Sequence, residues 1–401
     1  MRKKSQQEWI IVIKGKLIPI DNCLPFLVGL KHNRPDCSIT VITPTPGYHQ
    51  MLKKELFLHQ MVLKYGIEIR APEVSESIFQ RFKRRTLLIL FLLRASLFQK
   101  IFFLDIHLLG NVGRAVSLIN KYLHQGKSFG LLLSNMESKA EAYFNEIAAK
   151  ELKRKPPVYM SENLDGLLVS IGTDRYQNSK EMTKYKKIDV GYARGQPVWL
   201  NEIEKSEIEQ EELKSFKNGF VFWPLSIIKR DERGKCLFDL SFSISNSLKI
   251  FREVRPEIGI VFRYHPTTER DHFLQLLEES RFQNYHISSA HPLILVKQSE
   301  FVFSNIGTTI YSDAWFHRVP VIQYSPDPHI VGKHDLDRRL IAPSYAPIVN
   351  NFMKTESEFR LFLQKWPNPQ RKKQKLQTEK DVLERMQVAN IKNIIEEIES
   401  L

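Results

Sequence analysis

The chain has 401 residues, 42% of them hydrophobic, a formal net charge of +14 and a pI near 9.5. Its length exceeds the size at which one hydrophobic core usually stops growing, so we expect two domains, and its apolar share excludes a disordered chain. The three cysteines, Cys23, Cys37 and Cys236, form no CxxC pair, which argues against structural zinc and favours a reducing compartment. The positive charge favours an anionic partner, for which a membrane surface is a candidate, and without a zinc finger or an RNP sequence we expect no nucleic acid.

No membrane span is expected. The apolar stretch Trp9 to Ile13 is too short for the core of a signal peptide. The most hydrophobic region, Leu87 to Leu109, contains Arg94 and Asp105, which would be costly in hydrocarbon, so it predicts a buried helix followed by a strand. We therefore expect a cytoplasmic protein, with peripheral attachment to the inner face of the plasma membrane left open.

The first domain is predicted over residues 1–200. Short apolar runs rich in β-branched residues predict strands at 8–13, 38–43, 66–70, 100–105, 128–134 and 167–171. Helical sequence separates several of these runs, as at 47–65, and this alternation is typical of a largely parallel sheet. The charged segment 201–218 contains few large apolar residues and is the predicted linker.

The second domain is predicted over residues 219–366. Strands are expected at 220–223, 259–264, 285–288, 301–304 and 319–324, alternating with helices at 240–253, 269–280, 293–298 and 308–317. This order predicts a second doubly wound sheet. Residues 367–401 form a predicted helical tail, whose amphipathic part, 388–398, is expected to pack back on the N-terminal domain.

Two loops of the second domain follow strands at the edge where open parallel sheets bind ligands. The first contains His265, which is followed by Pro266 and can donate a hydrogen bond to a phosphate oxygen. The alternative is a histidine that only caps the next helix.

The second loop is Ser304-Asn305-Ile306-Gly307-Thr308-Thr309. Gly307 would let the backbone approach a ligand closely, and Thr308 and Thr309 would offer hydroxyl and N–H groups at a helix start, where anions bind. We therefore expect Ser304, Gly307, Thr308 and Thr309 to form a phosphate site. The alternative is an N-cap and a turn without a ligand.

The C-terminal half of GT-B glycosyltransferases resembles this order: strand, His265-Pro266, helix, strand, His291-Pro292, helix, strand, 304–309 loop, helix and Pro-Val-Ile. The order is similar in particular to that of the bacterial sialyltransferases and polysialyltransferases with a His-Pro motif, which act in capsule or lipopolysaccharide synthesis. The resemblance covers about residues 219–324. It implies an α/β fold of two Rossmann-like domains that face a central cleft, and it assigns His265, Thr308 and Thr309 to the phosphate of a CMP-activated sugar.

Three residues are candidates for catalysis. The family has an acidic motif, whose nearest match here is Glu162-Asn-Leu-Asp165-Gly166; Leu164 replaces an expected acid, and a plain turn is the alternative. This resemblance offers Asp165 as the catalytic base. Asp105, at the end of the strand Ile101 to Leu104, competes because it lies on a carboxyl edge, and His265 is the third candidate.

Metal and cofactor binding are not expected. The Asp335-Leu-Asp337 sequence lies in an Arg- and His-rich loop, and the chain has neither a Walker sequence nor a GxSxG elbow. We expect a metal-independent, inverting glycosyltransferase that moves a sugar from a nucleotide donor to a surface glycan or a lipid-linked glycan. The resemblance implies that this sugar is sialic acid or a related acidic sugar. The alternatives are a UDP-sugar 2-epimerase, a CDP-glycerol-type polymer transferase, and a non-catalytic partner in polysaccharide assembly.

Overall fold

The computed structural model divides the chain into two units, each with its own parallel sheet. It describes residues 7–13, 17–43, 46–71, 101–105, 126–133, 164–170, 183–206, 219–225, 228–230, 236–264, 269–326, 351–366 and 388–401, and the single residues Ser77, Phe79, Gln80, Phe82, Thr86, Leu90, Leu93 and Tyr122.

The chain passes from the first unit to the second inside a helix. Of the described residues, those up to Leu133, those from 164 to 202 and those from 388 onward belong to the first unit, and those from 203 to 366 belong to the second. The division falls within α8 (Pro197–Glu204), so the start of the predicted 201–218 linker is helical. Residues 207–218 lie outside the described part of the chain.

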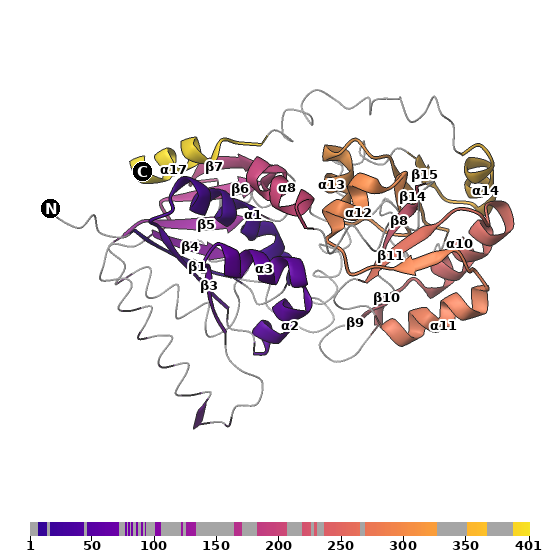
Figure 1. Ribbon diagram of the computed structural model, residues 1–401, viewed down its shortest axis with the longest axis horizontal. Helices are drawn as coiled ribbons and strands as arrows, with labels where there is room; N and C mark the ends of the chain where they lie inside the picture. Colours follow the sequence, from indigo (N-terminus) through magenta and orange to yellow (C-terminus); the bar gives the residue numbers. More distant parts are fainter. Residues whose placement is uncertain are drawn as a thin grey trace. The chain divides into compact units, whose positions relative to one another are not determined.

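The sheet of the first unit has seven parallel strands in the order β3-β2-β1-β4-β5-β6-β7 (Figure 1). The central strands are almost completely buried, as is usual for the inner strands of a parallel sheet. The order reverses between β1 and β4, which makes this pair the topological switch point. The strands are β1 (Glu8–Val12), β2 (Ser38–Ile42), β3 (Glu68–Arg70), β4 (Ile101–Asp105), β5 (Ser128–Leu132), β6 (Gly166–Ser170) and β7 (Lys186–Gly191).

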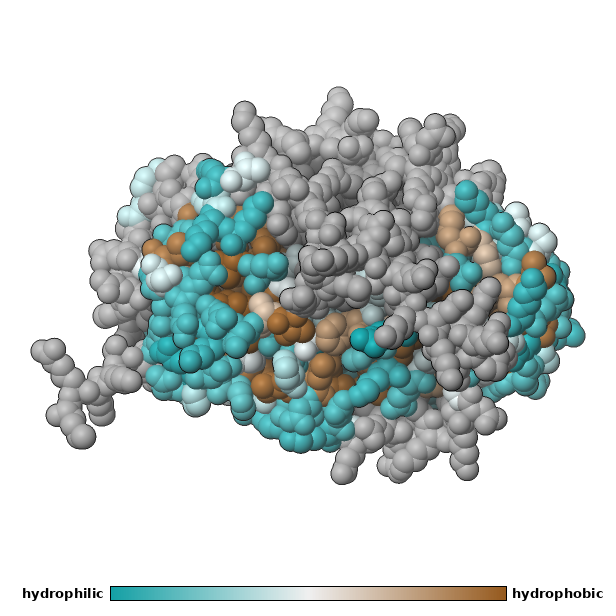
Figure 2. All heavy atoms as spheres, turned by 90° about the horizontal axis from the view of Figure 1, so that it is seen from above, coloured by the Kyte–Doolittle hydropathy of each residue, from teal (hydrophilic) through white to brown (hydrophobic). Residues whose placement is uncertain are grey.

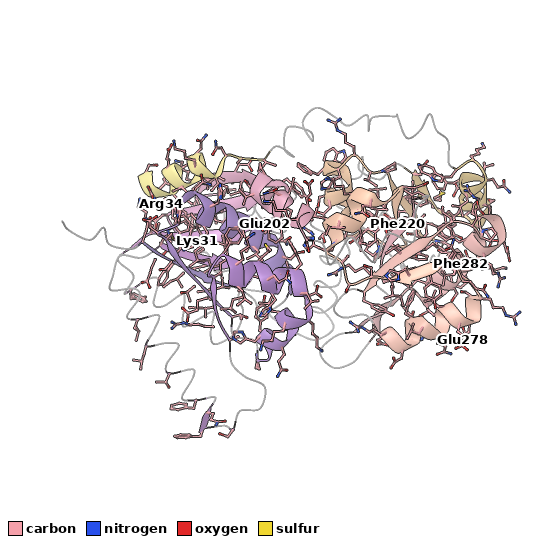
Figure 3. The ribbon with its side chains drawn as sticks, viewed as in Figure 1. Lys31, Arg34, Glu202, Phe220, Glu278 and Phe282 are labelled. Atoms are coloured by element: carbon pink, nitrogen blue, oxygen red, sulfur yellow. The ribbon has the colours of Figure 1, made fainter. Side chains whose placement is uncertain are left out.

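The C-terminal helix α17 (Ile391–Ser400) packs on the first unit, against α1 (Leu17–Asn33) and β7. The apolar stripe of α17 is buried, and a Cβ atom at Gly29 of α1 would lie only 3.0 Å from Ile391 Cγ1. Arg34, just after α1, donates to Glu399 over 2.6 Å, and Figure 3 shows it beside α17. The amphipathic 388–398 stretch therefore packs on the N-terminal unit, as its sequence pattern predicts.

The remaining helices of the first unit are shorter. The predicted helical stretch 47–65 is interrupted at Glu55, where the backbone leaves the helical region, and forms two helices. They are α2 (Tyr48–Lys54) and α3 (Leu56–Lys64), and a 3-10 turn, η1 (Ala193–Gly195), follows β7.

The sheet of the second unit has six parallel strands in the order β12-β11-β8-β13-β14-β15. Its switch point lies between β8 and β13. A two-stranded antiparallel hairpin, β9 (Ile228–Arg230) and β10 (Cys236–Asp239), follows β8. The sheet strands are β8 (Val221–Leu225), β11 (Ile260–Tyr264), β12 (Tyr285–Ile287), β13 (Phe301–Ser304), β14 (Val321–Tyr324) and β15 (Asn351–Met353).

Two groups of helices cover this second sheet. One group is α10 (Ser241–Val254), α11 (Arg270–Ser280) and α14 (Glu356–Gln364), in which α10 packs on the other two; the other is α12 (Pro292–Gln298) and α13 (Ile310–Phe316). Right-handed crossovers that leave the switch point in opposite directions place α10 and α13 on opposite faces of the sheet. Aromatic rings fill the α10 side: Phe303 lies 4.5 Å from Trp223 and 5.2 Å from Phe359, measured between ring centroids.

The described residues of the hydrophobic 87–109 region differ in burial. Strand β4 lies in the core, as predicted, but the side chain of Leu90, in the stretch predicted as a buried helix, is 53% exposed. None of the described helices is long and apolar enough to cross a membrane. The described surface seen from above is mostly hydrophilic, with small apolar patches (Figure 2).

Candidate functional site

Two connections leave the switch point of the second sheet at its carboxyl edge. The hairpin β9–β10 leads from β8 to the start of α10, and residues 305–309 lead from β13 to α13. Ligands of open α/β sheets bind in the crevice outside the strand ends at such a switch point. The predicted 304–309 loop therefore lies where the fold favours a ligand.

A buried hydrogen-bond network fixes the backbone of this loop. Ser304 Oγ donates to the Ile306 carbonyl over 2.8 Å and also contacts the hydroxyl of Tyr311. Ser325 Oγ, at the end of β14, donates to the Asn305 carbonyl over 2.6 Å, and Tyr311 contacts Gln323 Oε1 at 3.1 Å. Burial raises the pKa of Tyr311, so its hydroxyl keeps its proton and its role as a donor.

The side chain of Ser304 lies in the interior, whereas the sequence analysis expected it to contact a phosphate. Its side chain is buried, 2% exposed, and its hydroxyl is used within the loop. It was expected to contact phosphate, but this burial makes it a residue that positions the loop. The sequence could not separate these roles, because the burial of Ser304 depends on Tyr311 of α13, whose hydroxyl in turn bonds to Gln323 of β14.

Asn305 joins the loop to the opposite side of the switch point. Its Nδ2 donates to Ser247 Oγ on α10 over 3.0 Å and to the Tyr324 carbonyl over 2.8 Å, and the residue is 3% exposed. Within the described part of the chain, Asn305 Oδ1 and Ser243 Oγ are buried without a hydrogen-bond partner. A buried acceptor normally has one, so a water molecule or a ligand group is expected to bond to Asn305.

Gly307, Thr308 and Thr309 are partly exposed, and they face the solvent more than Ser304 does. Thr308 Oγ1 accepts from the Ile310 N–H at 3.4 Å, whereas Thr309 is the residue before α13 and forms no side-chain cap. Among the described glycines, a left-handed φ occurs at other positions and not at Gly307. Thus the turn itself does not require glycine at 307.

His265 lies outside the described residues, and its predicted role stays a prediction. His291, of the second His-Pro pair, is buried, and its Nδ1 accepts from the Leu293 N–H at 3.3 Å, so it caps α12. Arg263, which ends β11 with Tyr264, donates from Nε to the Ala290 carbonyl over 2.8 Å.

A second polar group lies near the start of α10, and the sequence analysis did not identify it. Asp239 Oδ1 accepts from both the N–H and the Oγ of Ser241, at 2.8 and 2.5 Å, and Ser241 Oγ lies 2.7 Å from His272 Nε2 on α11. If Ser241 donates to Asp239, its oxygen accepts from His272 Nε2. Asp239 precedes α10 and Ser241 is the first residue of that helix, but the contact with His272 depends on the packing of α11 against α10 and has no local sequence signal.

The two candidate carboxylates lie at opposite edges of the first sheet. Asp105 ends β4 at the carboxyl edge, beside the switch point, and is paired with Leu131 of β5. Asp165 precedes β6, at the amino edge; its Oδ2 accepts from the Ser128 N–H over 2.6 Å, and the residue is exposed. This position argues against Asp165 as the base.

A metal centre is not apparent in the part of the chain that the structure describes, where no three His, Cys, Asp or Glu side chains gather around one point. The predicted acidic pair, Asp335 and Asp337, lies outside the described residues.

The whole chain is similar to known structures, although no family model and no curated protein matches its sequence. A UDP-N-acetylglucosamine 2-epimerase matches 99% of this chain and 96% of its own, with 13% identity and a TM-score of 0.59. The Neisseria meningitidis UDP-GlcNAc 2-epimerase bound to UDP-GlcNAc matches 98% of this chain and 99% of its own, with 15% identity and a TM-score of 0.56. Arabidopsis thaliana UGT89C1 complexed with UDP-L-rhamnose matches 99% of both chains, with 9% identity and a TM-score of 0.56.

The chain has the GT-B fold. At these identities the likeness concerns the fold alone, and it agrees with the two Rossmann-like domains that the sequence predicted.

Proposed function

We propose that the chain is a nucleotide-sugar-dependent glycosyltransferase whose donor phosphate binds at the carboxyl edge of the second sheet. The observation that carries this proposal is the 304–309 loop, which lies at the switch point and is held in place by buried hydrogen bonds. The GT-B neighbours that were determined with UDP or a UDP-sugar support the same ligand class.

Thr308 and Thr309 are the proposed phosphate contacts, together with the backbone at Gly307 and with His265. Donors that are fixed before the reaction stabilise the leaving phosphate without reorganisation. For the base we favour Asp105, because it ends a strand at the carboxyl edge of the first sheet. A general base typically contributes about 10²- to 10⁴-fold to the rate. The reaction would then be inverting and would need neither a metal nor a cofactor.

The proposal also concerns the identity of the transferred sugar and of its acceptor. The resemblance of the His265-Pro266 and 304–309 motifs favours CMP-linked sialic acid or a related acidic sugar, and a surface or lipid-linked glycan as the acceptor. The structural neighbours instead contain UDP and UDP-sugars. Both nucleotides therefore belong in the first binding test.

A 2-epimerase is the second candidate function, because UDP-GlcNAc 2-epimerases are among the neighbours that align over nearly the whole chain. An epimerase converts its nucleotide sugar without an acceptor. A CDP-glycerol-type polymer transferase would respond to CDP, and a non-catalytic assembly partner would bind glycan without releasing nucleotide.

The test is a thermal-shift screen of CMP, CDP and UDP on the wild type and on the double variant Thr308→Ala/Thr309→Ala. A nucleotide that binds the native state raises its melting temperature, and we expect the variant to lose this shift. The matched control is Ser357→Ala, which removes an exposed hydroxyl from the first turn of α14. It should keep the shift.

Turnover then separates the reactions. The substrate for this test is the nucleotide sugar that carries the nucleotide with the largest thermal shift. A transferase releases the nucleotide only when a glycan acceptor is present. An epimerase converts the nucleotide sugar into its isomer without any acceptor. No shift with any nucleotide, or an equal shift in wild type and the double threonine variant, would contradict the proposed site.

A further inference from the structure

The start of α10 lies beside the 304–309 loop, across the switch point of the second sheet. Asn305 Nδ2 donates to Ser247 Oγ over 3.0 Å, and Ser247 Oγ donates to the Ser243 carbonyl over 2.6 Å, one turn nearer the helix start. Ser241, the first residue of α10, precedes Ser247 by six residues, which is about 9 Å of helix. The loop and the helix start therefore lie on the two sides of the point at which open sheets bind ligands.

Two polar atoms at this junction are buried without a hydrogen-bond partner in the described part of the chain. They are Asn305 Oδ1 and Ser243 Oγ, which lies in the first turn of α10. The two residues are 3% and 0% exposed. Because a buried polar atom normally has a partner, these atoms indicate that a ligand, or water that it orders, completes the junction.

An exposed aromatic ring and an exposed carboxylate lie at the same helix start, three residues apart. Phe242 is 60% exposed, although it is the second residue of α10. Asp239 uses Oδ1 to accept from the Ser241 N–H and Oγ, and a carboxylate has further lone pairs for another donor. The contact of His272 Nε2 with Ser241 Oγ, at 2.7 Å, holds this arrangement against α11. The helix start thus offers a stacking surface together with an acceptor for hydroxyl groups.

We propose that the start of α10 binds the nucleoside end of the nucleotide, with the base stacked on Phe242 and a ribose hydroxyl donating to Asp239. The inference rests on the proposed function, because it takes the phosphate to lie at Thr308 and Thr309 on the other side of the switch point. Asp239 would repel a second anionic group, so this side suits an uncharged part of the ligand. The nucleoside is uncharged, and its base has the flat π-face that stacks on an aromatic ring.

The first test concerns Phe242 and uses calorimetric titration of the full chain with CMP, UDP and ribose 5-phosphate. Phe242→Ala should bind CMP and UDP about tenfold more weakly than the wild type does, as expected for the loss of one base–aromatic stack. Ribose 5-phosphate has no base, so its affinity should not change. The matched control is Leu274→Ala, which removes a side chain of α11 that is 44% exposed and should leave all three affinities unchanged.

The second test concerns Asp239 and compares each nucleotide with its 2′-deoxy and 3′-deoxy forms. The wild type should bind at least one deoxy form about tenfold more weakly, because a hydrogen bond to a charged group is lost. Asp239→Asn should lose most of this discrimination, while its remaining oxygen still accepts from Ser241. Asp271→Asn, which changes an exposed carboxylate in the first turn of α11, should keep the discrimination.

Full affinity of Phe242→Ala for both nucleotides, or an equal loss of affinity for ribose 5-phosphate, would overturn the stacking. A wild type that binds both deoxy forms normally would overturn the contact with Asp239. If Phe242→Ala lost only the additional affinity of UDP-glucose over UDP, the helix start would bind the sugar instead, and the nucleoside assignment would be wrong.

The phosphate site is tested separately by Thr308→Ala/Thr309→Ala, which should weaken the binding of ribose 5-phosphate and of the nucleotides alike. Phe242→Ala should weaken only the nucleotides. The nucleoside assignment and the proposed function can therefore fail independently.

Discussion

Gly66 and Gly219 both have a positive φ, of 60° and 87°, but they differ in what surrounds them. A Cβ atom at Gly66 would meet nothing within 4 Å, whereas at Gly219 it would lie 2.7 Å from Glu300 Oε1 and 2.8 Å from Glu300 Cγ. Glu300 is held by Trp366, whose Nε1 donates to Oε2 over 2.9 Å. Alanine substitutions at the two positions therefore distinguish the energetic cost of backbone strain from the cost of steric overlap.

We expect Gly66→Ala to lower the free energy of unfolding by roughly 1–2 kcal/mol, the cost of a left-handed backbone for an L-residue. Gly219→Ala should cost roughly 1–3 kcal/mol more, because the Cβ atom also displaces Glu300. Thermal unfolding of each variant measures the difference. Equal effects of the two substitutions would show that Glu300 moves away freely.

The role of a residue could be predicted from the sequence where it depends only on neighbouring residues in the chain. The turn at 305–309 and its place after a strand could be predicted, because Gly307 and the threonines follow an apolar run. The burial of the Ser304 hydroxyl and the links from Asn305 to Ser247 and Tyr324 could not, because they depend on how separate elements pack.

At the scale of the elements, the direction of the strands favours Asp105 over Asp165 as the proposed base. All strands of the first sheet are parallel. Asp105 is the last residue of β4, whereas Asp165 directly precedes β6, so the two residues lie at opposite ends of the strands. We expect Asp105→Asn to lower kcat by about 10²- to 10⁴-fold without loss of nucleotide binding.

Asp165→Asn is the matched control, because asparagine keeps an oxygen that can accept the Ser128 N–H. It should leave kcat near that of the wild type. Steady-state kinetics on both variants checks this, and a large loss in Asp165→Asn with normal activity in Asp105→Asn would reverse the assignment.

Most elements of both sheets could be predicted, because buried parallel strands are continuous apolar runs. The elements missed were those that lack such runs. Strand β7 begins with two exposed lysines, β15 has three residues, and the hairpin β9–β10 lies in a strongly charged stretch. Helix α14 was missed too, although Thr355 and Glu358 form a capping box before its apolar face.

At the scale of the whole molecule, buried tyrosines make both units sensitive to alkali. Burial raises the pKa of Tyr48 in the first unit and of Tyr311 in the second, and burial is also the main cause that raises the pKa of Tyr65 to about 12. In the unfolded chain tyrosine titrates near pH 10. Above that pH the unfolded state binds fewer protons than the folded state, so stability falls as the pH rises.

Each such tyrosine should reduce the free energy of unfolding by up to about 1.4 kcal/mol per pH unit above pH 10. Tyr48→Phe is a clean test, because the Tyr48 hydroxyl is buried and has no hydrogen-bond partner among the described residues. We expect its melting temperature to match or exceed that of the wild type at pH 7 and to fall less steeply from pH 9 to 11. Parallel curves would contradict this account.

The return of α17 to the first unit also sets the order in which the two units are completed during translation. All described residues of the second unit, 203–366, leave the ribosome before residue 388, whereas the first unit needs residues from 388 onward. The unit that begins folding first is therefore finished last. Until α17 emerges, the surface of α1 that receives Ile391 stays uncovered, which is the kind of apolar surface that chaperones protect in nascent chains.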